Sequence, residues 1–174
     1  YNLLLALERR QDHLALPARK PEQSRQRSHH IRARQVILAT GSHERPMMFA
    51  NNDLPGIMLA TAVRRYLHEY AVLCGDEVVI AGNNDSIYAL ASELLDAGVR
   101  PVVVDSRDSG FDTRALQERG AVVRKSHAVI EAVGRDRVSG ARIAQVRQTG
   151  TRWDCITLPE TLPCNLIALS GGFS

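Results

Sequence analysis

Three short apolar runs, separated by two helical patterns, constrain the fold of this chain more than any other feature. The runs are residues 77–81, 102–105 and 121–123, and their valine-rich composition fits strands that are buried on both faces. Between the first two runs, apolar residues recur at helical spacing at Ile87, Leu90, Ala91, Leu94 and Leu95. A shorter helix is expected over residues 112–119, and Gly98 is a natural C-terminal cap for the first helix. This alternating order predicts a parallel sheet with right-handed crossovers.

The segments on either side extend the pattern. Residues 127–133, 138–146 and 153–158 are expected to form strands joined by glycine-containing turns, which predicts an antiparallel meander laid against the parallel sheet. A last apolar strand is expected over residues 164–169. Before the first run, apolar residues from Ile57 to Tyr70 follow helical spacing. The predicted fold class is α/β, a Rossmann-like parallel sheet with an antiparallel meander.

The N-terminal part is predicted to be a partial first dinucleotide-binding domain. Residues 2–8 are expected to form a buried strand, the polar stretch 11–30 to interrupt regular structure, and residues 32–39 to form an apolar strand running into Thr40 and Gly41. We therefore expect two domains: residues 1–71, a partial first domain with its connecting segment, and residues 72–174, an inserted Rossmann-like domain. The lack of an initiator methionine and of a closing helix suggests a fragment cut at both ends.

Composition excludes several classes of function. The chain is 44% hydrophobic, enough for a core, but no apolar run reaches the roughly 18 residues of a membrane span. Its net charge is only +3, and the basic stretch 19–34 contains no aromatic residue for stacking, which argues against nucleic-acid binding. Three cysteines without a C-x-x-C pattern argue against a disulfide framework, a zinc site and a dithiol centre, and fit a cytoplasmic protein.

The turn after residues 77–81 is the candidate nucleotide site. Dinucleotide-binding folds place G-x-G-x-x-G here, because the glycines make the turn, admit the pyrophosphate and let helix and strand pack closely. In this chain the three slots hold Gly82, Asn84 and Ile87, so only the first is met. Asp105 lies 105 − 82 = 23 positions after Gly82, where an acidic residue is expected to bind the adenosine ribose.

Two interpretations of this turn stay open. The expected cofactor ligands are Gly82, Asn83, Asn84, Asp105 and Arg107. Arg107 is close enough to contact a ribose 2′-phosphate, but Asp105 would repel one, so NAD is favoured over NADP. Against this, Asn84 would crowd a pyrophosphate and Ile87 would push the helix outward. The alternative is a Rossmann-like domain that has kept the architecture and lost the ligand.

A second candidate segment is the strand ending in Ala39, Thr40 and Gly41. It resembles the segment that returns the chain from the first dinucleotide domain in flavoproteins of the glutathione-reductase type. Glycine there lets the backbone pass close to a bound dinucleotide. This resemblance adds cofactor-binding candidates, which are Thr40, Gly41, Ser42, Gly171 and Gly172. His43 and Glu44 could form an acid/base pair, but a structural role is preferred because no nucleophile is identifiable nearby. No catalytic residue and no metal ligand is assigned.

A closer resemblance is carried by four runs of sequence. The runs A-T-G-S-H-E-R-P at residues 39–46 and F-A-N-N-D-L-P-G-I-M-L-A at residues 49–60 are similar to segments of sarcosine oxidase α subunits. Residues 83–86 and 169–174 are similar to the same family. The resemblance covers nearly the whole chain.

This resemblance implies a large α subunit in an αβγδ assembly. Such enzymes oxidise the N-methyl group of sarcosine to give glycine, hydrogen peroxide and a one-carbon unit for tetrahydrofolate. It implies FAD in the β subunit, FMN at the α/β interface and NAD held by α, mainly in a half that precedes this chain. The isolated fragment is expected to be inactive. A ligand-free scaffold for contact between subunits, and a subunit of a related amine or opine dehydrogenase, stay open as alternatives.

Overall fold

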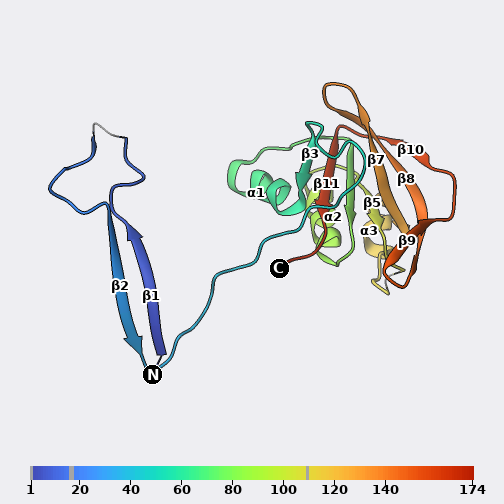
Figure 1. Cartoon of the computed structure of the whole chain (residues 1–174). Helices are drawn as coiled ribbons and strands as arrows, with labels where there is room; N and C mark the ends of the chain where they lie inside the picture. The colour runs from blue at the N-terminus through green and yellow to red at the C-terminus, as the bar shows by residue number, and fades with distance from the viewer. Residues whose placement is uncertain (1, 16–17, 109) are drawn as a thin grey trace. The chain divides into compact units, whose positions relative to one another are not determined.

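The computed structural model describes residues 2–15, 18–108 and 110–174 (Figure 1). The chain divides into two compact units, Tyr1–Gly41 and Ser42–Ser174, and each is described by itself.

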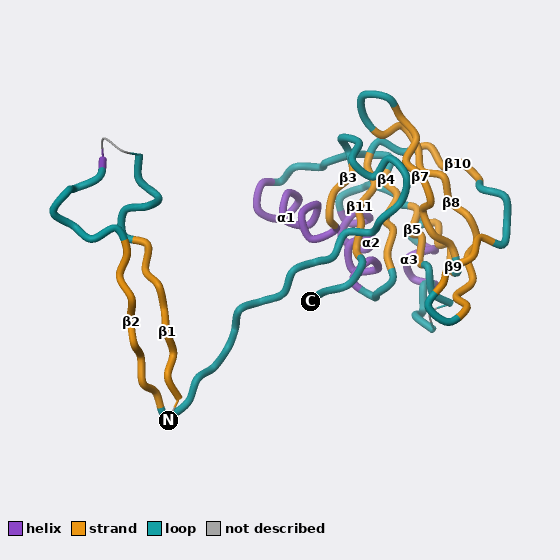
Figure 2. Tube along the Cα trace, viewed as in Figure 1, coloured by secondary structure: helices purple, strands orange, loops and turns teal. Residues whose placement is uncertain are grey.

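The first unit is a β-hairpin followed by an extended segment (Figure 2). Strand β1 (Asn2–Arg9) pairs antiparallel with β2 (Gln26–Ala33) over eight residue pairs, from Asn2 with Ala33 to Arg9 with Gln26. Gln11 stabilises the loop between them. Its side-chain amide donates to the carbonyl oxygens of Lys20 (3.0 Å) and Gln23 (2.7 Å), and its Oε1 accepts from the Lys20 N–H. Gln11 is only 3% exposed, so these bonds satisfy a buried polar group.

Three expectations for this unit are wrong in detail. Residues 2–8 do form a strand, but it is exposed rather than buried, since Leu5 and Leu7 are each 62% exposed. Residues 26–30 belong to β2 and not to an irregular polar stretch. Residues 34–39 lie outside any strand of the described chain, and Ile37 is 90% exposed. A strand needs a partner for its backbone groups; β1 takes β2, and no described strand pairs with residues 34–39.

The second unit is built on a five-stranded parallel sheet (Figure 1). Its order is β3 (Ile57–Leu59), β11 (Leu166–Ser170), β4 (Val78–Gly82), β5 (Val102–Asp105) and β6 (Val122–Lys125). The predicted parallel sheet is confirmed. Its last strand in sequence, β11, lies between β3 and β4 and aligns Leu166–Ser170 with Val78–Gly82.

Three helices pack on one face of this sheet: α1 (Ala60–Tyr70), α2 (Ser86–Asp96) and α3 (Arg114–Glu118). Helix α1 begins at Ala60 and not at Ile57, because residues 57–59 pair with β11. The side chain of Glu44 caps α1: its Oε2 accepts from the Thr61 N–H (2.9 Å) and from the Thr61 hydroxyl (2.6 Å). A carboxylate at a helix N-terminus satisfies free backbone donors and complements the helix dipole.

An antiparallel sheet covers the other face, as predicted. It consists of β7 (His127–Gly134), β8 (Val138–Thr149), β9 (Arg152–Cys155) and β10 (Glu160–Pro163). Strand β8 lies between β7 and β10, and also pairs with β9. Strand β10 was not expected from the sequence.

The two faces of the parallel sheet explain its continuous apolar strands. In β4, Val78 and Ile80 pack with the helices, whereas Val79 and Ala81 pack against the antiparallel sheet. Side chains in a strand alternate between faces, so a strand covered on both sides needs apolar residues at every position. The core therefore has two layers, and the parallel sheet holds the carboxyl ends of β4, β5 and β11 at one edge.

Candidate functional site

The candidate site lies at the carboxyl edge of the parallel sheet. Strand β4 ends at Gly82, β5 at Asp105 and β11 at Ser170, and the register pairs Gly82 with both Asp105 and Ser170. Ligands of open α/β sheets bind in the crevice outside such carboxyl ends. Residues that are far apart in the sequence therefore meet at the position expected for a cofactor.

Gly82 makes the close turn that the sequence pattern assigned to it. A Cβ on Gly82 would overlap Cγ2 of Ile87 and would lie 2.7 Å from the carbonyl oxygen of Ser170. The side chain of Ile87 is fully buried directly against this glycine. Ile87 thus does not push α2 away from the sheet; it packs into the space that the missing side chain of Gly82 leaves.

Asn84 closes the turn with its own side chain. Its amide nitrogen donates to the carbonyl oxygen (3.1 Å) and hydroxyl (3.0 Å) of Ser170. Its Oδ1 accepts from the Ser86 N–H (3.1 Å) and from the Ser86 hydroxyl (2.5 Å). Ser86 is the first residue of α2, so one of the helix's free N–H donors is already bound by the chain itself. The backbone N–H of Asn83 likewise donates to the Ser170 carbonyl oxygen at 3.3 Å.

Asp105 is fully buried and accepts hydrogen bonds from two other side chains of the protein. One carboxylate oxygen accepts from the backbone N–H (2.9 Å) and Nε (3.1 Å) of Arg107. The other accepts from Nη2 of Arg107 (2.9 Å) and from the Tyr88 hydroxyl (2.8 Å). Burial raises the pKa of Asp105, but the hydrogen bonds from Arg107 and Tyr88 outweigh it and hold the pKa below its usual value. Asp105 therefore stays ionised inside the protein.

Arg107 links Asp105 to the start of helix α2. Its Nη2 also donates to Oδ1 of Asp85 at 2.7 Å, and Asp85 is the residue that precedes the helix. Hydrogen bonding to Asp105 raises the pKa of Arg107 further above its usual range, so the guanidinium is always charged. Two carboxylates thus face one guanidinium, and the cluster keeps one negative charge.

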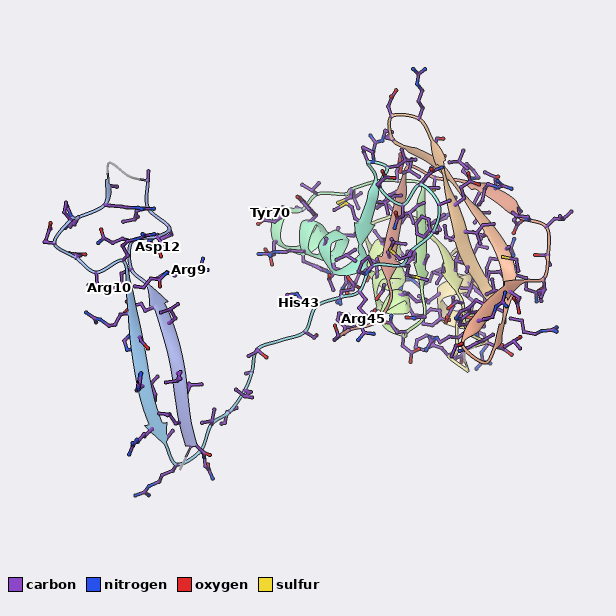
Figure 3. All side chains as sticks on the ribbon, viewed as in Figure 1. Arg9, Arg10, Asp12, His43, Arg45 and Tyr70 are labelled. Carbon is purple, nitrogen blue, oxygen red and sulfur yellow. The ribbon has the colours of Figure 1, made fainter. Side chains whose placement is uncertain are left out.

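The C-terminal glycines lie against the segment that follows Ser42. Backbone hydrogen bonds join His43 to Ser174 in both directions (2.9 and 3.0 Å), and Arg45 N–H donates to Gly172 O (2.8 Å). Figure 3 labels His43 and Arg45 on this segment. A Cβ on Gly171 would lie 2.8 Å from the carbonyl oxygen of Arg45, so only glycine lets the two segments approach.

The structure brings most of the predicted site residues together. Asn83, Asn84, Gly171 and Gly172 surround the carboxyl ends of β4 and β11. Asp105 ends β5, and Arg107 follows two residues later. Thr40 and Gly41 belong to the first unit, whereas Ser42 begins the second. Their assignment to a cofactor stays a prediction.

Sequence reasoning missed three participants, which are Asp85, Tyr88 and Ser170. Tyr88 lies on α2 at a position that faces β5, and the apolar periodicity of the helix signals only its burial. Asp85 and Ser170 adjoin Asn84 and Gly171 in the sequence, but no spacing rule for dinucleotide sites points to them.

A pocket adjoins the site on the side of the antiparallel sheet. It measures about 360 Å³ and is lined by residues that include Met47, Phe49, Asn83, Ser106 and Trp153. Its size is within the range of small-molecule pockets, roughly 300–1,000 Å³.

Neither a metal centre nor a membrane-spanning helix is found in the described part of the chain. Residues 2–15, 18–108 and 110–174 contain no group of three His, Cys, Asp or Glu side chains placed to bind a metal. Among the helices in those ranges, none has the length and apolarity to span a bilayer.

Comparison with known structures shows the fold. The chain is similar to a ferredoxin reductase from Rhodopseudomonas palustris (TM-score 0.58, 19% identity, covering 78% of this chain and 33% of that one). It is also similar to a NAD-dependent persulfide reductase from A. fulgidus (TM-score 0.59, 16% identity, 84% and 27%). The predicted Rossmann-like fold class is thereby confirmed.

Comparison with curated sequences shows the family, although no model of a known protein family matches the chain. It is 38% identical to the alpha subunit of sarcosine oxidase from Corynebacterium sp. (strain P-1), over 99% of this chain and 18% of the relative. It is 40% identical to the opine oxidase A subunit of Agrobacterium tumefaciens (strain Ach5), over 51% of this chain and 16% of the relative. The chain thus spans less than a fifth of the length of the curated relatives it matches. Because this similarity extends over nearly the whole of the chain, the chain belongs to the family of sarcosine oxidase alpha subunits.

Proposed function

We propose that the chain is a segment of an α subunit of a sarcosine oxidase, and that its second unit is a dinucleotide-type domain of that subunit. The observation that carries the proposal is the 38% identity over 99% of the chain. The whole enzyme would oxidise the N-methyl group of sarcosine, yielding glycine while O₂ is reduced to hydrogen peroxide, and pass the one-carbon unit to tetrahydrofolate. The chain itself would supply no catalytic residue.

The proposed complex contains β, γ and δ subunits beside α, and the proposed cofactors are FAD, FMN and NAD. NAD would be held by α, mainly in a part of the subunit that precedes this chain. The hairpin β1–β2 supports such a preceding part, since a two-stranded hairpin is at best marginally stable alone and Leu5 and Leu7 are largely exposed on it. A cytoplasmic location is part of the same proposal.

The domain boundaries proposed from the sequence are residues 1–71 and 72–174. Residues 57–70 pair and pack within the same compact unit as the second of these domains, through β3 beside β11 and α1 beside the sheet. We place the functional boundary after residue 71 because the strand–turn–helix of the dinucleotide pattern begins only with β4.

Oxidation of a related amine is the second candidate. The 40% identity to the opine oxidase A subunit over half of the chain supports it. Both relatives are oxidases, so the two candidates differ in substrate and not in the type of reaction proposed for this chain.

Co-expression of the full-length α subunit with its β, γ and δ partners tests the proposal. Peroxide formation is followed with sarcosine and, separately, with an opine such as octopine as substrate. We expect the complex to use sarcosine, and the 174-residue chain alone, supplied with FAD and FMN, to form no peroxide. A complex that oxidises only the opine would overturn the assignment to sarcosine, and peroxide formation by the chain alone would overturn its role as a non-catalytic segment.

A further inference from the structure

We infer that the unit Ser42–Ser174 fills its own dinucleotide crevice: Asn84 occupies the place of a pyrophosphate, and Arg107 occupies the place of a ribose on Asp105. The inference deepens the proposed function and rests on it for the dinucleotide-type role of this unit. It concerns binding alone, so it is tested separately from sarcosine oxidation.

The first step concerns the start of α2. A pyrophosphate binds at a helix N-terminus when backbone N–H groups point at it and glycine allows close approach. Here Oδ1 of Asn84 accepts from the Ser86 N–H at 3.1 Å, and the Asn84 amide reaches across to the Ser170 oxygens at 3.0 and 3.1 Å. The side chain therefore lies over the turn and uses the donor that a phosphate would need.

The second step concerns Asp105. A ribose diol would donate to this carboxylate, but Asp105 has no exposed surface, and it already accepts four hydrogen bonds from Arg107 and Tyr88. A ribose could reach it only if the Arg107 side chain left. The residue that the sequence identifies as a ribose ligand is thus a structural anchor for Arg107.

The third step concerns charge. Arg107 is shared between Asp105 and Asp85, and the side chain of Asp85 is 65% exposed beside the helix start. The leftover negative charge lies beside the helix start, where a doubly negative pyrophosphate would bind, so it opposes that binding. Hydrogen bonds within the chain and the charge of Asp85 thus both oppose binding of a dinucleotide. Both effects arise from side chains, whereas the backbone fold is that of a dinucleotide-type domain.

Calorimetric titration of the 174-residue chain with NAD up to 10 mM tests the inference. We expect no binding by the unsubstituted chain. The double variant Asn84→Gly, Asp85→Asn restores the second glycine and removes the exposed charge, and we expect it to bind NAD within the titrated range. Hydrogen exchange of the peptide that contains Gly82–Ser86 locates the site, since exchange should slow with NAD in the variant only.

Two single variants serve as matched controls. Asn84→Ala removes the hydrogen bonds but keeps a Cβ in the turn, and Asp96→Asn makes the same charge change at the other end of α2, where Asp96 pairs with Arg119. Neither should gain the affinity of the double variant. If the double variant does not fold, as judged by its Tm, Asn84→Gly alone carries the test. NAD binding by the unsubstituted chain with protection of Gly82–Ser86, or a folded variant without tighter binding, overturns the inference.

Discussion

Replacing Arg107 with alanine should destabilise the second unit strongly, because it leaves the buried carboxylate of Asp105 without its charged partner. Removing one partner of a buried ion pair costs about 3–5 kcal/mol. The Arg107 side chain is 34% exposed, and Asp105 keeps the Tyr88 hydroxyl and a backbone N–H as donors, so we expect the lower end, about 3 kcal/mol.

The stability that is lost in the Arg107→Ala variant should depend on pH, and the direction of this dependence follows from the pKa of Asp105. In the unsubstituted protein the pKa of Asp105 is lowered on folding, so the cluster contributes stability above the unfolded pKa, and this contribution is lost as pH falls through the folded pKa. Without Arg107 the burial of Asp105 dominates, and its pKa rises above the unfolded value. The deficit of the variant should therefore be larger at pH 7 than at pH 4.

Urea unfolding followed by far-UV circular dichroism at both pH values measures the effect. Arg114→Ala is the matched control, since Arg114 contacts Asp112 with the same two-residue spacing, backbone N–H included, but both side chains are exposed. The control should change stability little at either pH. A deficit for Arg107→Ala below about 1 kcal/mol, or one that is equal at pH 4 and pH 7, would refute this reasoning.

Three further predictions follow from other contacts. Gly171→Ala should loosen the residues before α1 and speed their proteolysis, because the new methyl group would lie 2.8 Å from a backbone oxygen; unchanged limited proteolysis would contradict this. Burial raises the pKa of Glu93, but hydrogen bonds from Arg64 and His68 of α1 outweigh burial and hold that pKa below its usual value. Glu93→Gln should therefore lower Tm at pH 7 more than at pH 3. Burial, with a nearby carboxylate, raises the pKa of the Cys164 thiol to about 11. After treatment with iodoacetamide at pH 8, mass spectrometry should therefore find alkylation of the exposed Cys155 and not of Cys164. Equal alkylation of the two cysteines would contradict the buried position of Cys164.

Local signals in the sequence determined much of the second unit. The valine-rich runs predicted β4, β5 and β6, and helical spacing followed by Gly98 predicted α2. These signals hold because a strand covered on both faces needs apolar residues at every position, whereas a helix on one face needs them only at every third or fourth. Gly82 was identified from the glycine pattern of the turn after β4, and Ile87 within that turn is one of the two neighbours that its missing side chain accommodates.

Contacts between distant segments were decided only by the tertiary structure. The insertion of β11 between β3 and β4, and the pairing of β1 with residues that looked irregular, depend on backbone partners that no local pattern specifies. The same is true of the site. Spacing alone placed Asp105 where a ribose ligand is expected, but spacing does not say which side chains reach its carboxylate. Arg107 and Tyr88 reach it in the folded chain, because a buried charge must be paired and hydrogen-bonded by whatever lies closest in space.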